Sequence, residues 1–462
     1  MADQLDDGAA LAAELRRLAA LDGFRAVPLA APTRALLRHF AAGDPDRPWP
    51  TGDVDWDEVY QGCCRNGLLG LAQRALANRR GEGRGSPPPP AFRRAVARAQ
   101  GLTGLRLAVL GRAGGSTLRG LLAAGVDPIV LKGPALGQLV YPEAALRPFG
   151  DLDLLLRARD VPAAHRALLA QGFEAGQDPA GLAPRLMPQL TPYELQYWHR
   201  GRQLLVEIHI DDPFSTGLVA RDLDGYWRRA VPITVGGVAA RALALDDQVL
   251  QLCAHAHYHG YTRLNWLADL AFIVRDHGPA LDWDRIAART RAEALEVPVY
   301  YSLHLLGALL DVHAPAGTLA ALRPDPFRRY WHARYLPEAR MLAWGAETRP
   351  FTGFFSAPFL GRLLPDMLVM GRRPEKARAL LRLLAPPAAW LRAYYRLAAD
   401  RPVAPHYLLH PLKLLAHAAA DVARALGGPR PGAAPQHPVF APPWSASRDA
   451  GRPGAAVPGD LA

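Results

Sequence analysis

The pattern that decides the fold lies at residues 127–156, which read DPIVLKGPALGQLVYPEAALRPFGDLDLLL. The runs DPIVL and DLDLLL are short, aliphatic and bounded by turn residues, as β-strands are. A stretch compatible with a helix follows Gly133 between them. Another predicted strand, LLVEIHI, covers residues 204–210, and the segments VPITV and VAARAL around Gly236 and Gly237 resemble a β-hairpin. Together these segments predict a small mixed sheet.

Outside this unit, apolar residues recur every three or four positions, which predicts helices. We therefore expect an α+β fold that is predominantly helical overall. The boundaries follow from changes in period and composition. They are an N-terminal helical region at 1–114 with a Pro/Gly-rich linker at 79–90, an α/β core at 115–244, a C-terminal helical bundle at 245–426, and a disordered tail at 427–462.

Composition limits the function only weakly. The chain has 462 residues, a net charge of +11 and only three lysines, so the arginine excess is better explained by a coding bias than by a mechanism. The charge allows an anionic partner such as a nucleotide or nucleic acid, but the arginines are scattered and nucleic acid is not specifically indicated. Three cysteines without a CxxC pair, an acidic N-terminus and no apolar run of about 20 residues predict a cytoplasmic protein without a transmembrane segment.

Acidic residues occupy one face of the two best strands. Side chains alternate across a strand, so Asp151 and Asp153 share a face, and Glu207 and His209 share a face of the second strand. Positions two apart on a strand are separated by about 6.5 Å, from which two carboxylates can reach one divalent cation or a close pair of cations. The alternative is that Asp151, Asp153 and Glu207 are solvent-facing residues of half-exposed strands. Mutual repulsion of metal-free carboxylates predicts that Asp153→Asn slightly raises stability.

Lys132 and Gly133 stand where the first strand turns into the following helix. Backbone N–H groups at a helix N-terminus together with a lysine ammonium suit a phosphate group. Alone, a Lys-Gly pair is a weak signal, and it remains a hypothesis that this turn binds phosphate.

A later helical segment contains three histidines. His255 and His259 share one helix face, whereas His257 points away. No nearby cysteine or HExxH pattern completes a zinc site. The aromatic and arginine pattern at 388–401 suits a membrane surface or nucleic acid, but core packing with arginine stems along its edge explains it equally well.

The stretch LKGPALGQLVYPEAALRPFGDLDLLL resembles the signature of a bacterial family of uncharacterised nucleotidyltransferases, which are similar to the DNA polymerase β-like superfamily. The VEIHI strand and the block LCAHAHYHGYTRLNWLADLAFIV extend the resemblance over about residues 115–274. It implies that Asp151, Asp153 and Glu207 form a catalytic triad of acids that holds Mg²⁺ around an NTP. The superfamily commonly has a Gly-Ser pair where this chain has Lys132, Gly133 and Pro134, so the resemblance does not fix how the triphosphate binds.

The same resemblance supplies further binding candidates. Arg147 matches an arginine of the family pattern and becomes a second candidate for phosphate contact. His209, His255 and Asp269 are expected to face the nucleotide, although His255 and Asp269 could equally be satisfied core groups. The implied activity is Mg²⁺-dependent transfer of a nucleoside monophosphate, with ATP as the first candidate NTP, to a hydroxyl of an unknown acceptor. The alternatives are a non-catalytic nucleotide- or partner-binding protein, or an antitoxin-like regulator with the same fold.

Overall fold

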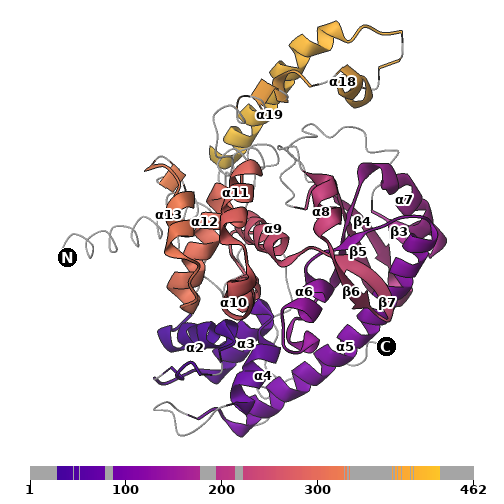
Figure 1. The fold of residues 1–462 in the computed structure, drawn as a ribbon. Coiled ribbons are helices and arrows are strands. Elements are labelled where there is room, and N and C mark those ends of the chain that lie inside the picture. The colour runs from indigo at the N-terminus through magenta and orange to yellow at the C-terminus, as the bar shows by residue number, and fades with distance from the viewer. Residues whose placement is uncertain are drawn as a thin grey trace, which may run out of the picture.

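The computed structural model describes residues 29–176 and 194–326, with short gaps at 45, 51, 79–86 and 214–221, together with residues 328–329 and 332 and most of 377–426. The predicted tail and most of the predicted linker lie outside these residues. Within them the fold is α+β and mostly helical, as the sequence predicts (Figure 1).

One mixed sheet of seven strands forms the α/β part. Its order is β3-β4-β5-β2-β1-β7-β6, and the central pair β2 and β5 runs parallel. The predicted strands are confirmed, whereas β3 and β4 were not anticipated. The strands are β1 (Ile129–Val130), β2 (Asp151–Leu156), β3 (Glu174–Ala175), β4 (Glu194–His199), β5 (Leu204–Ile210), β6 (Val231–Val235) and β7 (Val238–Ala242).

The β6–β7 hairpin is confirmed and turns at two glycines. Gly236 and Gly237 have φ values of 55° and 78°. Two successive positive φ angles are those of a type I′ turn, which matches the twist of the flanking strands and is disfavoured for side chains with a Cβ. The turn lies against the helix α5 (Pro90–Ala123), since a Cβ on Gly236 would come within 2.2 Å of the Gly111 carbonyl oxygen.

The two faces of the sheet belong to different hydrophobic cores. On one face, alternate residues of β2 and β5, such as Leu154 and Ile208, pack with Leu118 and Leu121 of α5 and with Leu168 of α7 (Val161–Ala170). On the other face, residues such as Leu155 join a larger core made by the helical bundle. The acidic positions of β2 and β5 lie on this second face, toward the bundle.

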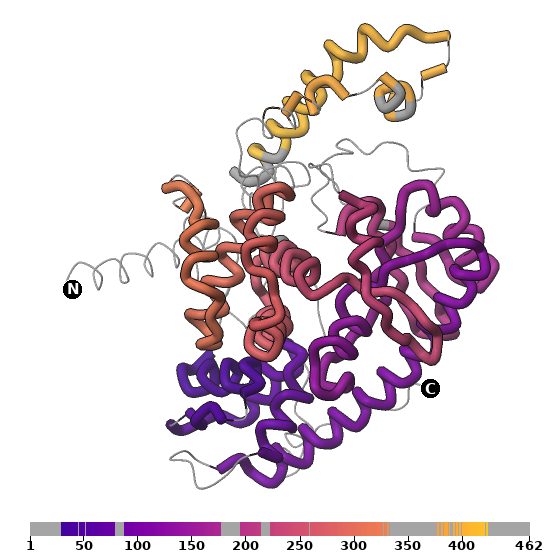
Figure 2. Tube along the Cα trace, in the orientation of Figure 1, coloured from indigo at the N-terminus to yellow at the C-terminus, as the bar shows by residue number. Residues whose placement is uncertain are grey.

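The bundle combines helices from both ends of the described chain. Helices before the sheet and helices after it contribute to one core, so segments far apart in sequence lie side by side (Figure 2). The helices that contribute to this core are α2 (Ala31–Ala42), α3 (Trp56–Asn66), α4 (Leu69–Ala77), α6 (Gly133–Leu139), α8 (Leu223–Arg229), α9 (Leu245–Tyr258), α10 (Leu264–His277), α11 (Trp283–Ala292), α12 (Glu296–Leu305) and α13 (Ala316–Leu322), with short 3₁₀ or π segments between some of them. Two later helices, α18 (Ala388–Tyr394) and α19 (Ala404–Leu426), contribute none of their described residues to it.

Helix α5 connects the two cores. Its N-terminal part contributes Phe92 and Val96 to the bundle core, and its C-terminal part contributes Leu118 and Leu121 to the sheet core. The middle of the helix is exposed; Leu105, for example, has 68% of its surface accessible. Among the described residues, no helix is both long enough and apolar enough to cross a bilayer.

Candidate functional site

Two acids meet on neighbouring strands. β2 and β5 are parallel and in register, and Asp153 is the direct pairing partner of Glu207. Since side chains at paired positions project from the same face, both carboxylates lie on the side of the sheet that faces the bundle. The predicted convergence is therefore found for Asp153 and Glu207. Asp151, two positions before Asp153 on the same strand, shares that face.

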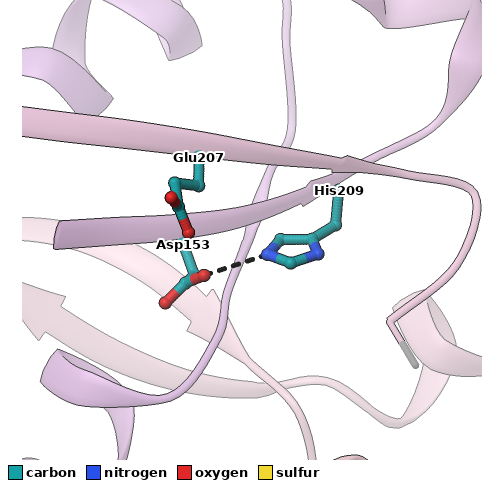
Figure 3. A group of neighbouring side chains, drawn as sticks. All are labelled: Asp153, Glu207 and His209. Atoms are coloured by element: carbon teal, nitrogen blue, oxygen red, sulfur yellow. Dashed lines mark hydrogen bonds and ion pairs between the residues drawn. The ribbon is translucent and has the colours of Figure 1, made fainter. Parts of the chain in front are cut away.

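His209 joins this pair. Its Nε2 lies 2.9 Å from Asp153 Oδ1, and both side chains are almost completely buried (Figure 3). One potential ligand atom each from Asp153, Glu207 and His209 lies within 4.8 Å of the others. We call these three residues the Asp-Glu-His group. The sequence placed all three on this face, but it did not predict the contact between His209 and Asp153.

Lys132 approaches the same carboxylate. Its Nζ lies 2.9 Å from Asp153 Oδ1, and its side chain is 13% exposed. The residue links β1 to α6 with φ 49° and ψ −123°, a conformation that non-glycine residues seldom adopt. The backbone N–H of Leu131 donates to the Asp153 carbonyl at 2.9 Å, which holds this turn against β2. Lys132 therefore points at the acids, whereas a contact with phosphate stays a prediction.

Gly133 is required by close packing at this turn. A Cβ at this position would lie 2.5 Å from Cβ of Phe149, a distance that real Cβ atoms do not reach. Its place at the start of α6 thus has a packing reason. Its predicted role in nucleotide binding stays a prediction.

The charges around Asp153 stabilise its ionised form. Burial alone would raise the pKa of Asp153, but the nearby Lys132 ammonium and the hydrogen bond from His209 hold that pKa below its ordinary value. Burial opposes protonation of Lys132, but Asp153, with smaller contributions from Asp151 and Glu207, raises the pKa of the ammonium. Both groups of the pair are therefore charged at neutral pH.

Asp151 is in a different electrostatic position. Burial and the neighbouring Asp153 charge raise the pKa of Asp151, partly offset by Lys132 and Arg147. Repulsion between carboxylates thus disfavours the charge of Asp151, whereas Lys132 and His209 stabilise the charge of Asp153. This difference reverses the expectation that Asp153→Asn stabilises the metal-free protein; that expectation applies to Asp151 instead.

Glu207 has a partner that sequence reasoning missed. Gln196 on β4 is the antiparallel pairing partner of Glu207, and its Nε2 donates to Glu207 Oε1 at 2.9 Å. The signal was present in ELQYWH, where the buried residues Leu195 and Tyr197 alternate with the exposed residues Gln196 and Trp198. That period-two pattern predicts a strand whose Gln196 shares the face of the acids.

Arg147 and Asp269 bind each other. The Arg147 Nε and Nη2 atoms donate to the two Asp269 carboxylate oxygens at 2.6 and 2.9 Å, and Tyr141 Oη donates to Asp269 Oδ1 at 2.6 Å. All three groups are buried, and Asp269 is 0% exposed. The bidentate pair joins the segment before β2 to α10. The predicted nucleotide contacts of Arg147 and Asp269 stay predictions, and the described structure gives both residues a role in packing the bundle against the sheet.

The histidines of α9 are arranged as the helical spacing predicts. The His255 and His259 rings are 4.6 Å apart, and each lies 5.1 Å from the Trp266 ring, whereas His257 contacts other residues. Burial lowers the pKa of His259 to about 4 and that of His255 well below its usual value; the nearby Lys132 ammonium contributes to both shifts. Both rings are therefore neutral at pH 7, and the charge of Asp153 acts on His259. The role of His255 toward a nucleotide stays a prediction.

The Asp-Glu-His group fits a divalent cation. Two carboxylate oxygens and one imidazole nitrogen within 4.8 Å of one another are hard and borderline donors, and the acids bring more negative charge than Lys132 alone offsets. Asp153 and Glu207 are the natural oxygen ligands. Asp151 is near enough to influence the charge of both Asp153 and Lys132, so it can complete the set of acids.

A buried sheet face with converging carboxylates defines a candidate metal-binding site of the kind that phosphoryl-transfer enzymes use. Residues 52–311 match the family described as uncharacterised nucleotidyltransferase, which is more than half of the chain. The chain belongs to this family. No curated protein and no solved structure is detectably similar to it.

Proposed function

We propose that this protein transfers a nucleoside monophosphate from an NTP to a hydroxyl of an acceptor, with a divalent cation held by the acids of the sheet. One observation carries the proposal. Asp153 and Glu207 are paired across adjacent parallel strands with potential ligand atoms within 4.8 Å, in a chain of a nucleotidyltransferase family. Mg²⁺ is the cation we favour because two or three carboxylates and substrate phosphates suit its preference for oxygen ligands.

Each residue of the site has a defined task in this proposal. A bound divalent cation would neutralise phosphate charge and lower the pKa of an acceptor hydroxyl. Asp153 and Glu207 bind it, and Asp151 adds a third carboxylate. His209 orients Asp153 through the contact at Nε2, and Gln196 orients Glu207 through its side-chain amide. Preorganised ligands of this kind need no rearrangement during the reaction.

The nucleotide would bind between the sheet face and the bundle. Arg147 is paired with Asp269, whereas the Lys132 ammonium lies beside the acids, so we assign Lys132 to the triphosphate. ATP is the first NTP to test. The acceptor is a small molecule, a peptide or a protein that carries a hydroxyl group.

Labelled nucleotides test the activity. Purified protein is incubated with each α-³²P NTP, Mg²⁺ and a cell lysate, and labelled products are separated and identified. We expect transfer by the wild-type protein and by Asp160→Asn, a matched control seven positions after Asp153 with its side chain outside the Asp-Glu-His group. Asp153→Asn should give none.

The same proteins are tested for ligand binding by thermal denaturation. Mg²⁺ with the correct NTP should raise the melting temperature of wild type and of Asp160→Asn, because ligand binds only the native state. If no NTP gives either label or a thermal shift with the wild type, transfer is refuted. A thermal shift without label in any lysate would instead support the non-catalytic nucleotide-binding alternative.

A further inference from the structure

The Asp153 carboxylate is already neutralised by a cation that belongs to the protein. Lys132 Nζ and His209 Nε2 both lie 2.9 Å from the same oxygen, Oδ1. The Asp153 side chain is 3% exposed, so little water can screen this contact. A divalent ion that binds Asp153 must therefore either displace the Lys132 ammonium or share a carboxylate with it.

Sharing is electrostatically unfavourable. The Lys132 Nζ atom lies 2.9 Å from Asp153 Oδ1, and a lysine side chain, with an ordinary pKa of about 10.4, is charged at the neutral pH at which metal binds. An ammonium and a divalent ion at the same buried carboxylate repel each other, and low solvent exposure strengthens that repulsion. By itself, then, free metal competes with Lys132 for Asp153.

An incoming triphosphate changes this balance. Its negative charges offer the ammonium another partner, and lysine binds phosphate as a flexible point charge. Movement of the Nζ atom from Asp153 Oδ1 to phosphate would free one acceptor position of that oxygen for the metal, while His209 Nε2 keeps its own contact with it. The turn around Lys132 fixes the backbone, since Leu131 is bonded to β2 and Gly133 packs against Phe149, so the exchange needs only rotation of the side chain.

We propose that Lys132 is a built-in counter-ion of Asp153 that excludes free divalent cations and yields the site when metal and a triphosphate arrive together. This inference rests on the proposed function and adds a rule of binding: metal and nucleotide bind cooperatively through Lys132. Lys132 acts on metal through Asp153, so toward the metal it is a positioning residue. Its removal should strengthen binding of the metal alone, which loss of a merely structural contact would not do.

Binding of Mn²⁺ alone, followed by electron paramagnetic resonance, is the primary test. We expect Lys132→Met, which keeps an unbranched side chain without the charge, to bind Mn²⁺ at least tenfold more tightly than wild type. Lys132→Arg keeps the charge and should bind weakly, as wild type does. Lys413→Met, a lysine change beside Tyr394 and Tyr395 of the C-terminal helices, is the matched control and should leave Mn²⁺ affinity unchanged.

Nucleotide should then separate the variants. A non-hydrolysable triphosphate analogue should raise the Mn²⁺ affinity of wild type at least tenfold, and that of Lys132→Met much less. Equal or weaker Mn²⁺ binding by folded Lys132→Met overturns the proposal. The metal site of the proposed function is refuted instead if wild type and the Lys132 variants bind no more Mn²⁺ than Asp153→Asn does, with or without nucleotide.

A second measurement observes Lys132 directly and requires no substitution at the site. The whole chain has only three lysines, so ¹⁵Nζ labelling of lysine gives at most three ammonium signals. Lys376→Arg and Lys413→Arg identify the other two signals, which leaves that of Lys132. Its signal should shift when Mg²⁺ and the analogue are added together and stay in place with Mg²⁺ alone at the same concentration. A full shift with Mg²⁺ alone overturns the proposal.

Discussion

Substitution of Asp153 by Asn should destabilise the protein before any ligand is added. The change keeps the shape of the side chain but leaves the Lys132 ammonium buried beside a neutral amide. Removing one partner of a buried ion pair costs about 3–5 kcal/mol. We take about 3 kcal/mol here because Lys132 is 13% exposed and the Asn oxygen can still accept a hydrogen bond.

The expected shift can be measured by thermal denaturation without metal. For a protein larger than 150 residues, 1 kcal/mol corresponds to about 2 °C, so Asp153→Asn should lower the melting temperature by about 6 °C. The loss should be constant between about pH 6 and pH 8. The Asp153 pKa is held below its ordinary value, so its contribution is present above about pH 4 and disappears only as pH falls through the lowered pKa. The Lys132 pKa is raised, so its contribution disappears only at high pH.

Asp151→Asn is the matched control, since it is the same change two positions earlier on the same strand. Burial and the Asp153 charge raise the pKa of Asp151, so loss of its charge should leave the melting temperature unchanged or higher. Both variants should lose the stabilisation that wild type gains from Mg²⁺ with NTP, about 2.7 kcal/mol at a ligand concentration 100 times Kd. If Asp153→Asn melts at or above the wild-type temperature, the account of Asp153 as a compensated carboxylate is wrong.

Three further outcomes follow from single contacts. Gly133→Ala should lower stability by about 1–3 kcal/mol, measured by thermal denaturation, because its Cβ would overlap Phe149. Asp269→Asn should cost about 3–5 kcal/mol by chemical denaturation because Arg147 would stay buried without its counter-ion, and a cost below 1 kcal/mol would contradict that role. The pKa of His259 is lowered to about 4, so stability should fall as pH drops from about 6.5 to 4; His259→Gln should reduce this loss in parallel melting curves.

The sequence predicts the sheet face and its acids well because both depend on local order. Alternation places Asp151 and Asp153 on one face of β2, and Glu207 and His209 on one face of β5. The structure then pairs Asp153 with Glu207 in register, which brings these residues to the same face of the sheet. The missed strand β4 carries the same kind of signal and ends just before the predicted strand β5, with which it pairs antiparallel, so its alternation and position could have added it to the sheet.

Contacts between segments that are far apart in the sequence could not be predicted from local sequence patterns. Lys132 and Asp153 are 21 positions apart, and Arg147 and Asp269 are 122 apart, so neither pairing can be derived from periodicity. In the sequence, each of these charged residues was a candidate for contact with substrate or metal. In the fold, each is bound to another residue of the protein, and a ligand must compete with that contact. The shared core of early and late helices is equally a property of tertiary packing.

Helix α5 gives the molecule a mechanical property. It has 34 residues and is therefore about 51 Å long, with one end built into the bundle core and the other into the sheet core. Because both ends are packed, a change in the angle between the sheet and the bundle would have to bend this helix or repack one of its ends. Gly101 and Gly104 lie in the middle of the helix, where a Cβ at either position would meet nothing within 4 Å and each glycine weakens the helix by about 1 kcal/mol relative to alanine. The middle of α5 is thus the part of the helix that can bend without repacking either hydrophobic core.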